Sequence, residues 1–337
     1  MKIVVTGGAG FIGSNFVRLV LAEHPDDEIT VLDKLTYAGN LDNLKDVAGD
    51  PRYRFVKGDI CDAEVVGATV AGADAIVNFA AETHVDRSID SPEDFLYTDI
   101  IGTHTLLEVV RAHGIAKMVQ VSTDEVYGSI DVGSFCETDC LHASSPYSAS
   151  KAGGDLQVLA YHTTYGTPAL ITRGSNTYGP YQYPEKLIPL FVTNALEGEP
   201  LPLYGDGLNI RDWLHVDDHA DGIEAALLLG RPGEIYNIGG GNEHTNREIT
   251  TIILAELGLD WREYVRQVDD RPGHDRRYSI SCEKARTELG WKPVVDFDTG
   301  LRETIRWYRD NDWWWSKIKH GTAEFADWRH RWYEKRG

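Results

Sequence analysis

The chain has 337 residues, a formal net charge of −20 at pH 7, and ordinary apolar, charged and aromatic fractions. Nucleic acids and anionic membranes need a broad basic surface, so this charge argues against both as partners, although local Arg and Lys side chains can still hold a small anion. Length and composition also argue against a disordered or repeat protein and favour one or two globular domains.

The chain lacks the sequence features of a membrane, metal or disulfide protein. No apolar run approaches the roughly 20 residues of a membrane-spanning helix, and the first residues show no basic n-region or long apolar h-region, so we expect no secretory leader. Cys61, Cys136, Cys140 and Cys282 show no Cys-x-x-Cys spacing. We therefore expect reduced thiols, a cytoplasmic location and no metal, and we read the i, i+4 pair of histidines at 215 and 219 as part of an ordinary helix.

Short β-branched runs alternate with amphipathic stretches through the first half of the chain. The runs that predict strands are residues 2–6, 28–32, 53–56, 75–79, 117–122 and 169–172, and the helical stretches include 11–23, 97–113 and 147–165. This alternation predicts an α/β fold with a doubly wound, Rossmann-type parallel sheet.

The second half is less regular. Prolines and aromatic residues are frequent after Gly179, a strand-helix-strand pattern returns at 211–238, and helices are expected at 247–257 and 301–311, with a basic loop at 271–277 between them. We predict a Rossmann-type domain made of residues 1–178 with 209–240 returning to it. A smaller, mixed α/β lobe is expected from residues 179–208 and 241–337.

The sequence TGGAGFIG, Thr6 to Gly13, directly follows the first predicted strand and opens a helix. Its glycines fit G-x-G-x-x-G and let the backbone approach a pyrophosphate at the helix N-terminus, which indicates a dinucleotide site. Asp33 ends the second strand, where a carboxylate accepts from ribose hydroxyls and favours NAD over NADP, although the neighbouring Lys34 leaves that choice open. Residues 58–60 are candidates to flank the adenine.

Three further elements carry acid–base chemistry. Tyr147 and Lys151 lie at i, i+4 on one predicted helix, so the ammonium is expected to lower the pKa of the phenol toward neutrality. Alone this spacing is weak, and a solvated helix face is the simpler interpretation; with Thr123 and the Gly-rich turn it indicates hydride and proton transfer. Asp124 and Glu125 follow Thr123 at the end of a strand, where a loop or helix cap is the competing reading.

With these motifs, together with FAAETHVDRSI, STDEVYG, YSASKAG, NTYGPYQYPEKLIPLF, LYGDGLNIRDWLHVDDH and DRPGHDRRY, the whole chain resembles the extended short-chain dehydrogenase/reductase superfamily. Within it the chain is most similar to the dTDP-glucose 4,6-dehydratases. The resemblance implies oxidation at C4 of the sugar with NAD, loss of water across C5 and C6, and return of hydride to C6. A UDP-sugar epimerase or decarboxylase and a catalytically silent NAD sensor remain the alternatives.

The resemblance also implies a role for each acid–base residue. Tyr147 is the base for the C4 hydroxyl, supported by Thr123 and Lys151; Glu125 removes the C5 proton, and Asp124 protonates the departing C6 hydroxyl. Such chemistry needs Asp124 protonated while Glu125 is ionised, and neighbouring acids titrate apart because a second negative charge is resisted.

Contacts to the two ligands follow from the same resemblance. The cofactor contacts are Gly7, Gly10, Phe11, Ile12, Gly13, Asp33, Lys34, Leu35, Thr36, Asp59, Ile60, Ala80, Ala81, Thr98, Tyr147 and Lys151. The sugar-nucleotide contacts are Glu82, His84, Thr123, Asn176, Lys186, Leu187, Pro202, Tyr204, Arg211, Asn246, Arg271, His274 and Tyr278, with Thr83 at the rim. Thr177 departs from the pattern, which has a second Asn there, near the nicotinamide end of the cofactor.

The resemblance further implies a homodimer in which the helices at 97–113 and 147–165 form a four-helix bundle. The three consecutive tryptophans at 313–315 could stack on a sugar, but packing within the smaller lobe is the favoured interpretation.

Overall fold

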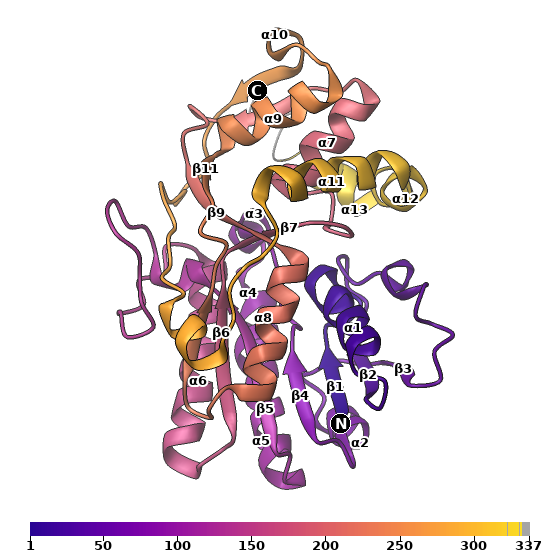
Figure 1. The fold of residues 1–337 in the computed structure, drawn as a ribbon, viewed down its shortest axis with the longest axis vertical. Coiled ribbons are helices and arrows are strands. Elements are labelled where there is room, and N and C mark those ends of the chain that lie inside the picture. The colour runs from indigo at the N-terminus through magenta and orange to yellow at the C-terminus, as the bar shows by residue number, and fades with distance from the viewer. Residues whose placement is uncertain (322, 330, 332–337) are drawn as a thin grey trace.

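Residues 1–321, 323–329 and 331 are described by the structure, a computed structural model. Figure 1 shows a large parallel sheet with helices on both faces and a smaller lobe beyond its carboxyl edge. No helix in these ranges is long and apolar enough to cross a membrane.

The central sheet has seven parallel strands in the order β10-β6-β5-β4-β1-β2-β3. Its strands are β1 (Lys2–Thr6), β2 (Glu28–Asp33), β3 (Tyr53–Lys57), β4 (Ala75–Asn78), β5 (Lys117–Thr123), β6 (Ala169–Gly174) and β10 (Ile235–Ile238). The order reverses between β1 and β4, as it does in a doubly wound fold, and this confirms the predicted fold class.

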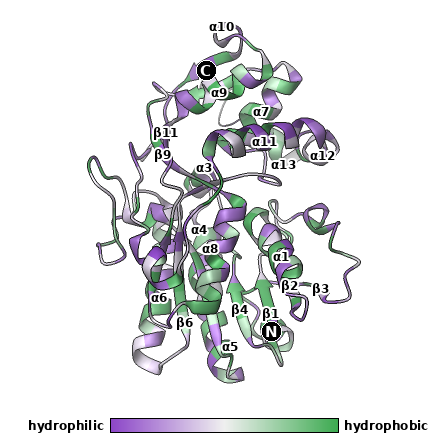
Figure 2. Ribbon diagram, viewed as in Figure 1, coloured by the Kyte–Doolittle hydropathy of each residue, from purple (hydrophilic) through white to green (hydrophobic). Residues whose placement is uncertain are grey.

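Two apolar layers sandwich this sheet and bury most residues of every strand except the edge strand β3. Helices α1 (Phe11–Glu23) and α8 (Val216–Leu229) pack together over one face. Helices α2 (Ala63–Val70), α5 (Thr103–His113) and α6 (Pro146–Tyr165) cover the other face. Figure 2 shows the matching pattern, with hydrophobic strands inside and polar residues on the outer sides of the helices.

Helix α6 carries Tyr147 and Lys151, and its ends are set by local sequence. Ser145 and Ser148 form a capping box at its start, with Pro146 in the first turn, and Gly166 ends it in the left-handed conformation. The predicted helix at 97–113 is more complex: α4 (Pro92–Phe95) leads into a π-helical segment, η2 (Leu96–Gly102), and only then into α5. Here η2 lies directly against α6.

The smaller lobe is built on two short sheets. One contains β7 (Asn176–Tyr178), β9 (Ile210–His215) and β11 (Glu243–Thr245), and the other pairs β8 (Leu201–Tyr204) with β12 (Val265–Val268). Its helices are α7 (Leu187–Glu197), α9 (Asn246–Leu257), α10 (Trp261–Tyr264), α11 (Phe297–Asp310), α12 (Asp312–Gly321) and α13 (Ala323–Arg329). The remaining short segments are α3 (Val85–Asp90), η1 (Leu41–Leu44), η3 (Asp124–Tyr127) and η4 (Ala285–Leu289).

Residues 209–240 are shared between the two parts of the molecule. Strand β9 pairs in the three-stranded sheet. Strand β10 belongs to the central sheet, and α8 packs against that sheet. The division into residues 1–178 with 209–240 and residues 179–208 with 241–337 stays a prediction.

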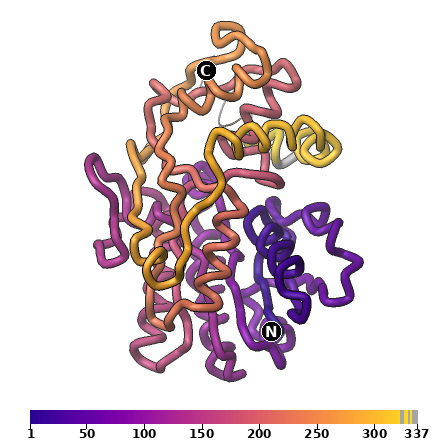
Figure 3. Tube along the Cα trace, in the orientation of Figure 1, coloured from indigo at the N-terminus to yellow at the C-terminus, as the bar shows by residue number. Residues whose placement is uncertain are grey.

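The apolar core of the smaller lobe includes two of the three consecutive tryptophans. Trp314 and Trp315 are buried in it, while Trp313 is partly exposed. This agrees with the packing role expected for the run. Figure 3 shows the C-terminal helices, in yellow, lying close to the indigo and purple loop that follows β2.

Candidate active site

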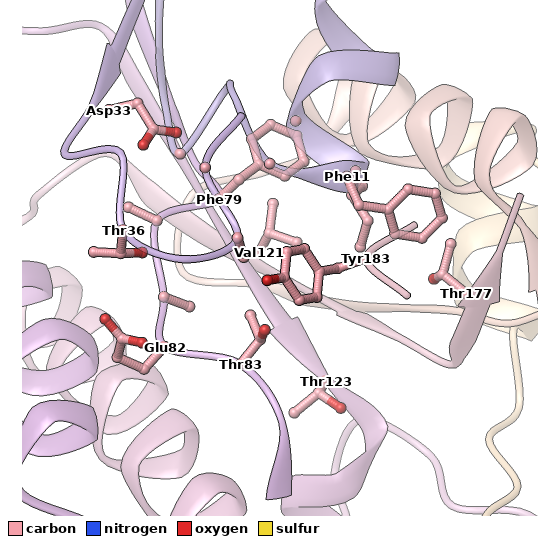
Figure 4. Close-up of a pocket in the computed structure, with 18 of the residues that line it drawn as sticks. Phe11, Asp33, Thr36, Phe79, Glu82, Thr83, Val121, Thr123, Thr177 and Tyr183 are labelled. Carbon is pink, nitrogen blue, oxygen red and sulfur yellow. The ribbon is translucent and has the colours of Figure 1, made fainter. Parts of the chain in front are cut away.

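A cavity of about 280 Å³ lies at the carboxyl ends of the central strands. Its walls come from the Gly-rich turn after β1, the end of β2, the segment after β4, the end of β5 and the start of α6, with residues of the smaller lobe on the far side. Figure 4 shows Asp33 and Thr36 on one side of it, and Phe11 and Thr177 on the opposite side. Ligands of open α/β sheets bind at this edge.

Two glycines of the Gly-rich turn have no room for a side chain. Gly7 has a φ of 68°, and a Cβ there would lie 2.5 Å from the backbone nitrogen of Ala80. A Cβ at Gly13 would lie 2.6 Å from the carbonyl oxygen of Gly7. The N-cap of α1, Gly10, offers no side-chain hydrogen bond, so the first amides of the helix face the cavity and suit a pyrophosphate.

Asp33 is held at the end of β2 by two backbone amides. Its carboxylate accepts from the nitrogens of Ala9 at 3.0 Å and Leu35 at 2.8 Å. Burial raises the pKa of Asp33, while these two amides act in the opposite direction. Beside it, the ammonium of Lys34 is engaged by Asp59 at 2.7 Å. An adenosine ribose bound here would meet a carboxylate, and the neighbouring ammonium of Lys34 is already paired; these observations fit NAD.

Of the sixteen predicted cofactor residues, all except Leu35 line the cavity. Leu35 instead has a left-handed backbone, with a φ of 58°, and contributes its amide to Asp33. The sequence interpretation missed several lining residues, which come from distant segments: Asn40, Asn43, Phe79, Tyr181, Gln182, Tyr183, His219 and Trp314.

Thr123, Asp124 and Glu125 lie together where β5 ends against the cavity. The Thr123 hydroxyl accepts from the amide of Glu125 at 3.2 Å and thereby caps the short helix η3. The same hydroxyl donates to Asp124 at 3.3 Å. Thr123 thus holds the Asp124 carboxyl and the backbone of Glu125. The competing view of this pair as a solvated loop does not fit, since Asp124 is 2% exposed.

The two carboxyls differ in their surroundings. Burial, followed by the charges of Glu125 and Asp212, raises the pKa of Asp124 well above its ordinary value. Burial also raises the pKa of Glu125, but three cations, Arg271, Arg211 and Lys186, oppose the rise. Asp124 is therefore the group that keeps a proton, and Glu125 is the one that loses it first.

The expected lowering of the pKa of Tyr147 is wrong for this structure. Burial, followed by the nearby charges of Glu125 and Asp99, raises the pKa of Tyr147 well above its ordinary value, while a hydrogen bond with Thr123 acts in the opposite direction. Lys151 meanwhile donates its ammonium to the carbonyl oxygen of Val121 at 2.8 Å. Spacing along the helix predicted a shared site but not the anionic surroundings of the phenol.

Four of the predicted sugar-nucleotide residues line the cavity: Glu82, Thr123, Asn176 and Lys186. Burial, followed by the charges of Asp99 and Asp94, raises the pKa of Glu82 to about 7. The carbonyl oxygen of the Asn176 side chain is buried without a hydrogen-bond partner in the described chain. These groups are available to a ligand.

The other nine predicted sugar-nucleotide residues do not line the cavity. Arg271 donates to Asp86 at 3.0 Å, and the Tyr204 hydroxyl donates to the other oxygen of that carboxylate at 3.1 Å. Arg211 lies over the ring of Tyr278 at 4.3 Å. The remaining residues are placed as follows: His84 precedes α3, Leu187 begins α7, Pro202 lies in β8, Asn246 begins α9 and His274 pairs with Asp270 at 2.6 Å.

Thr177 and His219 form a pair at the cavity wall that the sequence interpretation did not anticipate. The Thr177 hydroxyl lies 2.7 Å from Nδ1 of His219, and burial lowers the pKa of His219 to about 4, which keeps the imidazole neutral. His219 thus belongs to the site rather than to an ordinary helix surface. No cluster of three or more potential metal ligands occurs among the residues that the structure describes.

Comparisons with known proteins agree over nearly the whole chain. A family model described as GDP-mannose 4,6 dehydratase matches residues 4–304. The chain is 54% identical to a dTDP-glucose 4,6-dehydratase of Streptomyces antibioticus over 328 residues, which cover 96% of this chain and 97% of that protein.

Solved structures give the same result. A dTDP-glucose 4,6-dehydratase of Streptomyces venezuelae, crystallised with NAD and dTDP, is 58% identical, with a TM-score of 0.93 over 95% of this chain and 100% of that one. A dTDP-glucose 4,6-dehydratase of Bacillus anthracis in complex with NAD is 52% identical, with a TM-score of 0.89 and the same coverage of both chains.

Proposed function

The chain belongs to the sugar-nucleotide dehydratase family of extended short-chain dehydrogenases/reductases, and from this premise we propose that it converts dTDP-glucose to dTDP-4-keto-6-deoxyglucose. The single observation that carries this proposal is the pair of carboxyls at the end of β5. Asp124 and Glu125 border the same cavity as Tyr147, and their surroundings favour different protonation states.

NAD is the proposed cofactor, and the residues present fit it. The Gly-rich turn would hold the pyrophosphate, Asp33 would accept from the adenosine ribose, and the end with Thr123, Tyr147 and Lys151 would take the nicotinamide. Bound NAD supplies an acceptor for the C4 hydride, a donor of hydride to C6, and a positively charged ring whose field lowers the pKa of Tyr147.

Tyr147 acts first, as the base that takes the proton of the C4 hydroxyl. Its own pKa is raised by burial and by neighbouring carboxylates, so the residue is poised for this role only beside a positive charge. Lys151 contributes from the same helix and is anchored through Val121. The product of this step is a 4-ketone, which acidifies the proton on C5.

Elimination of water then requires two proton transfers on one substrate. Glu125, whose ionised form is favoured by Arg271, Arg211 and Lys186, takes the C5 proton. Asp124, which retains its proton because it is buried beside Glu125, gives that proton to the departing C6 hydroxyl. After hydride has reached C6, Glu125 returns a proton to C5.

The epimerase alternative explains less of the site. Removal and return of hydride at a single carbon needs no additional acid–base pair, so a 4-epimerase would have no task for Asp124 and Glu125. A decarboxylase would likewise leave the pair without a task. The comparisons do not favour these alternatives, and the presence of Tyr147, Lys151 and Glu125 in one cavity argues against a silent sensor.

The sugar nucleotide is proposed to lie between the cavity and the smaller lobe. Arg211, Arg271 and Lys186 place three cations beside Glu125, which suits a diphosphate in an otherwise strongly acidic protein. Asn176, with an unpaired side-chain oxygen, is proposed to accept from the sugar. Thr177 holds His219 and takes the place of the second amide expected there.

We also propose a homodimer in the cytoplasm. The support for the dimer is a group of exposed apolar side chains on the packed pair of η2 and α6: Leu96, Tyr97, Ile101 and Leu156. Such a patch on the outside of two helices is typical of a subunit contact. The support for the location is the set of four unpaired cysteines.

Incubation of the enzyme with dTDP-glucose in deuterated water tests the proposed function. The expected product, observed by NMR, is the 4-keto-6-deoxy sugar nucleotide with deuterium at C5, because Glu125 exchanges its proton with solvent. Asp124→Asn should lower product formation by about 10²- to 10⁴-fold, since one proton transfer loses its donor. A 4-epimer as the sole product, or full activity of Asp124→Asn, would contradict the proposal.

A further inference from the structure

The segment Lys34–Leu44, called the strap below, forms one wall of the cavity. It directly follows Asp33 and contributes Lys34, Thr36, Ala38, Gly39, Asn40 and Asn43 to the lining. The strap is tightly folded at its root: Leu35 has a φ of 58°, and a Cβ at Gly39 would lie 2.8 Å from the Asp33 carboxylate. A left-handed Leu is costly, so other contacts must hold this conformation.

The first of these contacts joins the strap to a second wall of the cavity. Tyr37 donates its hydroxyl to the carbonyl oxygen of Thr83 at 2.6 Å, and Thr83 belongs to the segment after β4 that also lines the cavity. The ring of Tyr37 is held from two sides, by the Arg87 guanidinium at 3.5 Å and by the edge of Tyr183. Two walls of the nucleotide site are thus joined through one side chain.

The second contact comes from the C-terminal part of the chain. Trp314 of α12 donates its indole N–H to the side-chain oxygen of Asn43 at 2.8 Å, and both residues are 1% exposed. The amide of Asn43 in turn donates to the carbonyl oxygen of Ala9, inside the Gly-rich turn, at 2.9 Å. Ala9 donates to Asp33, so the hydrogen bonds run from the smaller lobe to the adenosine end of the site.

Other contacts of α12 support the same placement. Lys317 pairs with Asp42 at 2.9 Å, and Trp314 itself lines the cavity. The apolar core of the smaller lobe, to which Trp314 belongs, also packs against Tyr37 and Ala38 of the strap. Figure 3 shows the two segments near each other, although 271 positions separate Asn43 from Trp314.

We propose that Tyr37 and Trp314 lock the strap over the dinucleotide, so that NAD stays bound through the whole reaction. This inference rests on the proposed function, in which hydride leaves C4 and returns to C6 of the same sugar. Such a reaction consumes no net oxidant, and it fails whenever the reduced nucleotide escapes before hydride has returned to C6. Because Tyr37 and Trp314 hold the strap at two points, the strap retains the nucleotide in the cavity.

Exchange of bound NAD in the purified holoenzyme tests the lock. The holoenzyme is mixed with excess isotopically labelled NAD, and the rate of replacement is followed by mass spectrometry of the protein-bound nucleotide. Trp314→Phe retains the apolar packing but leaves the buried Asn43 oxygen unpaired, and we expect about tenfold faster exchange. Tyr37→Phe removes the hydroxyl that contacts both the carbonyl and the side-chain oxygen of Thr83, and we expect about fivefold faster exchange.

Trp315→Phe is the matched control. Trp315 is also buried, and it donates to the carbonyl oxygen of Tyr308 at 2.7 Å, within the smaller lobe and away from the strap. Its exchange rate should stay within about twofold of wild type. Turnover of Trp314→Phe, but not of Trp315→Phe, should become dependent on added NAD.

Two results would overturn the lock. One is unchanged exchange in both Trp314→Phe and Tyr37→Phe; the other is equal acceleration in Trp315→Phe, which would assign the effect to loosening of the lobe. The proposed function fails differently: the wild-type protein would then bind no NAD or would leave dTDP-glucose unchanged, whatever the exchange rates of the variants.

Discussion

Asp124 is placed at a cost to the stability of the protein. Its carboxyl is 2% exposed, next to Glu125, and one of its oxygens has no hydrogen-bond partner in the described chain. Such a site favours a neutral acid, which is what the departure of water requires. The burial that suits Asp124 to its role in catalysis therefore lowers the stability of the folded protein.

The stability effect of Asp124 depends on pH with a definite sign. Its folded pKa lies above the pKa in the unfolded chain, so protonation stabilises the fold in acid, and this stabilisation is lost as pH rises through the folded value. Asn mimics the neutral carboxyl at every pH. Asp124→Asn should therefore raise the melting temperature at pH 7 to 8, and the gain should vanish below about pH 4.

The size of this gain reports how far the pKa is raised. Each pH unit between the unfolded and folded pKa values adds about 1.4 kcal/mol to the advantage of Asn at high pH. Thermal unfolding of both proteins at one NAD concentration, repeated across pH, measures it. A variant that is less stable than wild type at neutral pH would mean that Asp124 is stabilised there as a carboxylate.

The sequence was a good guide to some site residues and a poor one to others. Asp33 and the glycines were predictable because a strand, a turn and a helix in succession fix their positions. The pKa of Tyr147 was not, because its rise comes from burial and from Glu125 and Asp99, which reach it from other elements. The spacing of residues along a helix predicts which side chains can lie together, whereas burial and neighbouring charges determine their protonation states.

At the cofactor site, the backbone of the Gly-rich turn lies directly against the backbone that follows β4. Gly7 is left-handed, and any Cβ there would meet backbone atoms of Phe79 and Ala80, which cannot move aside as a flexible side chain could. The turn and the segment after β4 must therefore stay in direct contact for the helix amides of α1 to face the cavity.

Gly7→Ala should consequently abolish retention of NAD through gel filtration. Gly72→Ala is the matched control, because Gly72 is also left-handed, with a φ of 78°, but a Cβ there would meet no atom of the described chain within 4 Å. The control should lose only about 1–2 kcal/mol of stability through backbone strain and should keep its nucleotide. Equal loss of NAD from both variants would show that left-handed strain, not the contact with Ala80, governs binding.

The elements differ in how far local sequence determines them. The ends of α6 follow from Ser145, Pro146 and Gly166, and the strands of the central sheet follow from their apolar runs. Helix α7 was not predicted, because it follows a proline-rich stretch and has a proline of its own. That residue, Pro189, lies in the first turn, where proline is tolerated. The π-helical form of η2 has no signal in the apolar periodicity and accompanies its close packing against α6.

The molecule as a whole joins two lobes around one cavity, and this assembly was the least predictable feature. The walls include Asn43 and Trp314, which no local pattern connects, since their hydrogen bond depends on how α12 packs against η1. The predicted parallel sheet brings the Gly-rich turn and residues 123–125 to one edge, because they follow parallel strands whose carboxyl ends meet there. The covering of the site depends on long-range packing that a single sequence does not reveal.

The proposed assembly into a dimer also belongs to the scale of the whole molecule. Leu156 of α6 is 57% exposed, and a charge there would oppose burial of this face against a second copy. We expect Leu156→Glu to sediment as a monomer, whereas Leu229→Glu, at the similarly exposed end of α8, should remain dimeric. A wild-type protein that sediments as a monomer would remove the dimer from this account.

The central claim is that one dinucleotide, held in the cavity, carries hydride from C4 to C6 of a single sugar. The most direct test uses dTDP-glucose deuterated at C4, in ordinary water, with the product analysed by NMR and mass spectrometry. We predict one deuterium in the new C6 methyl group and no crossover when a mixture of labelled and unlabelled substrate is used. Deuterium retained at C4, lost to solvent or shared between product molecules would contradict the claim.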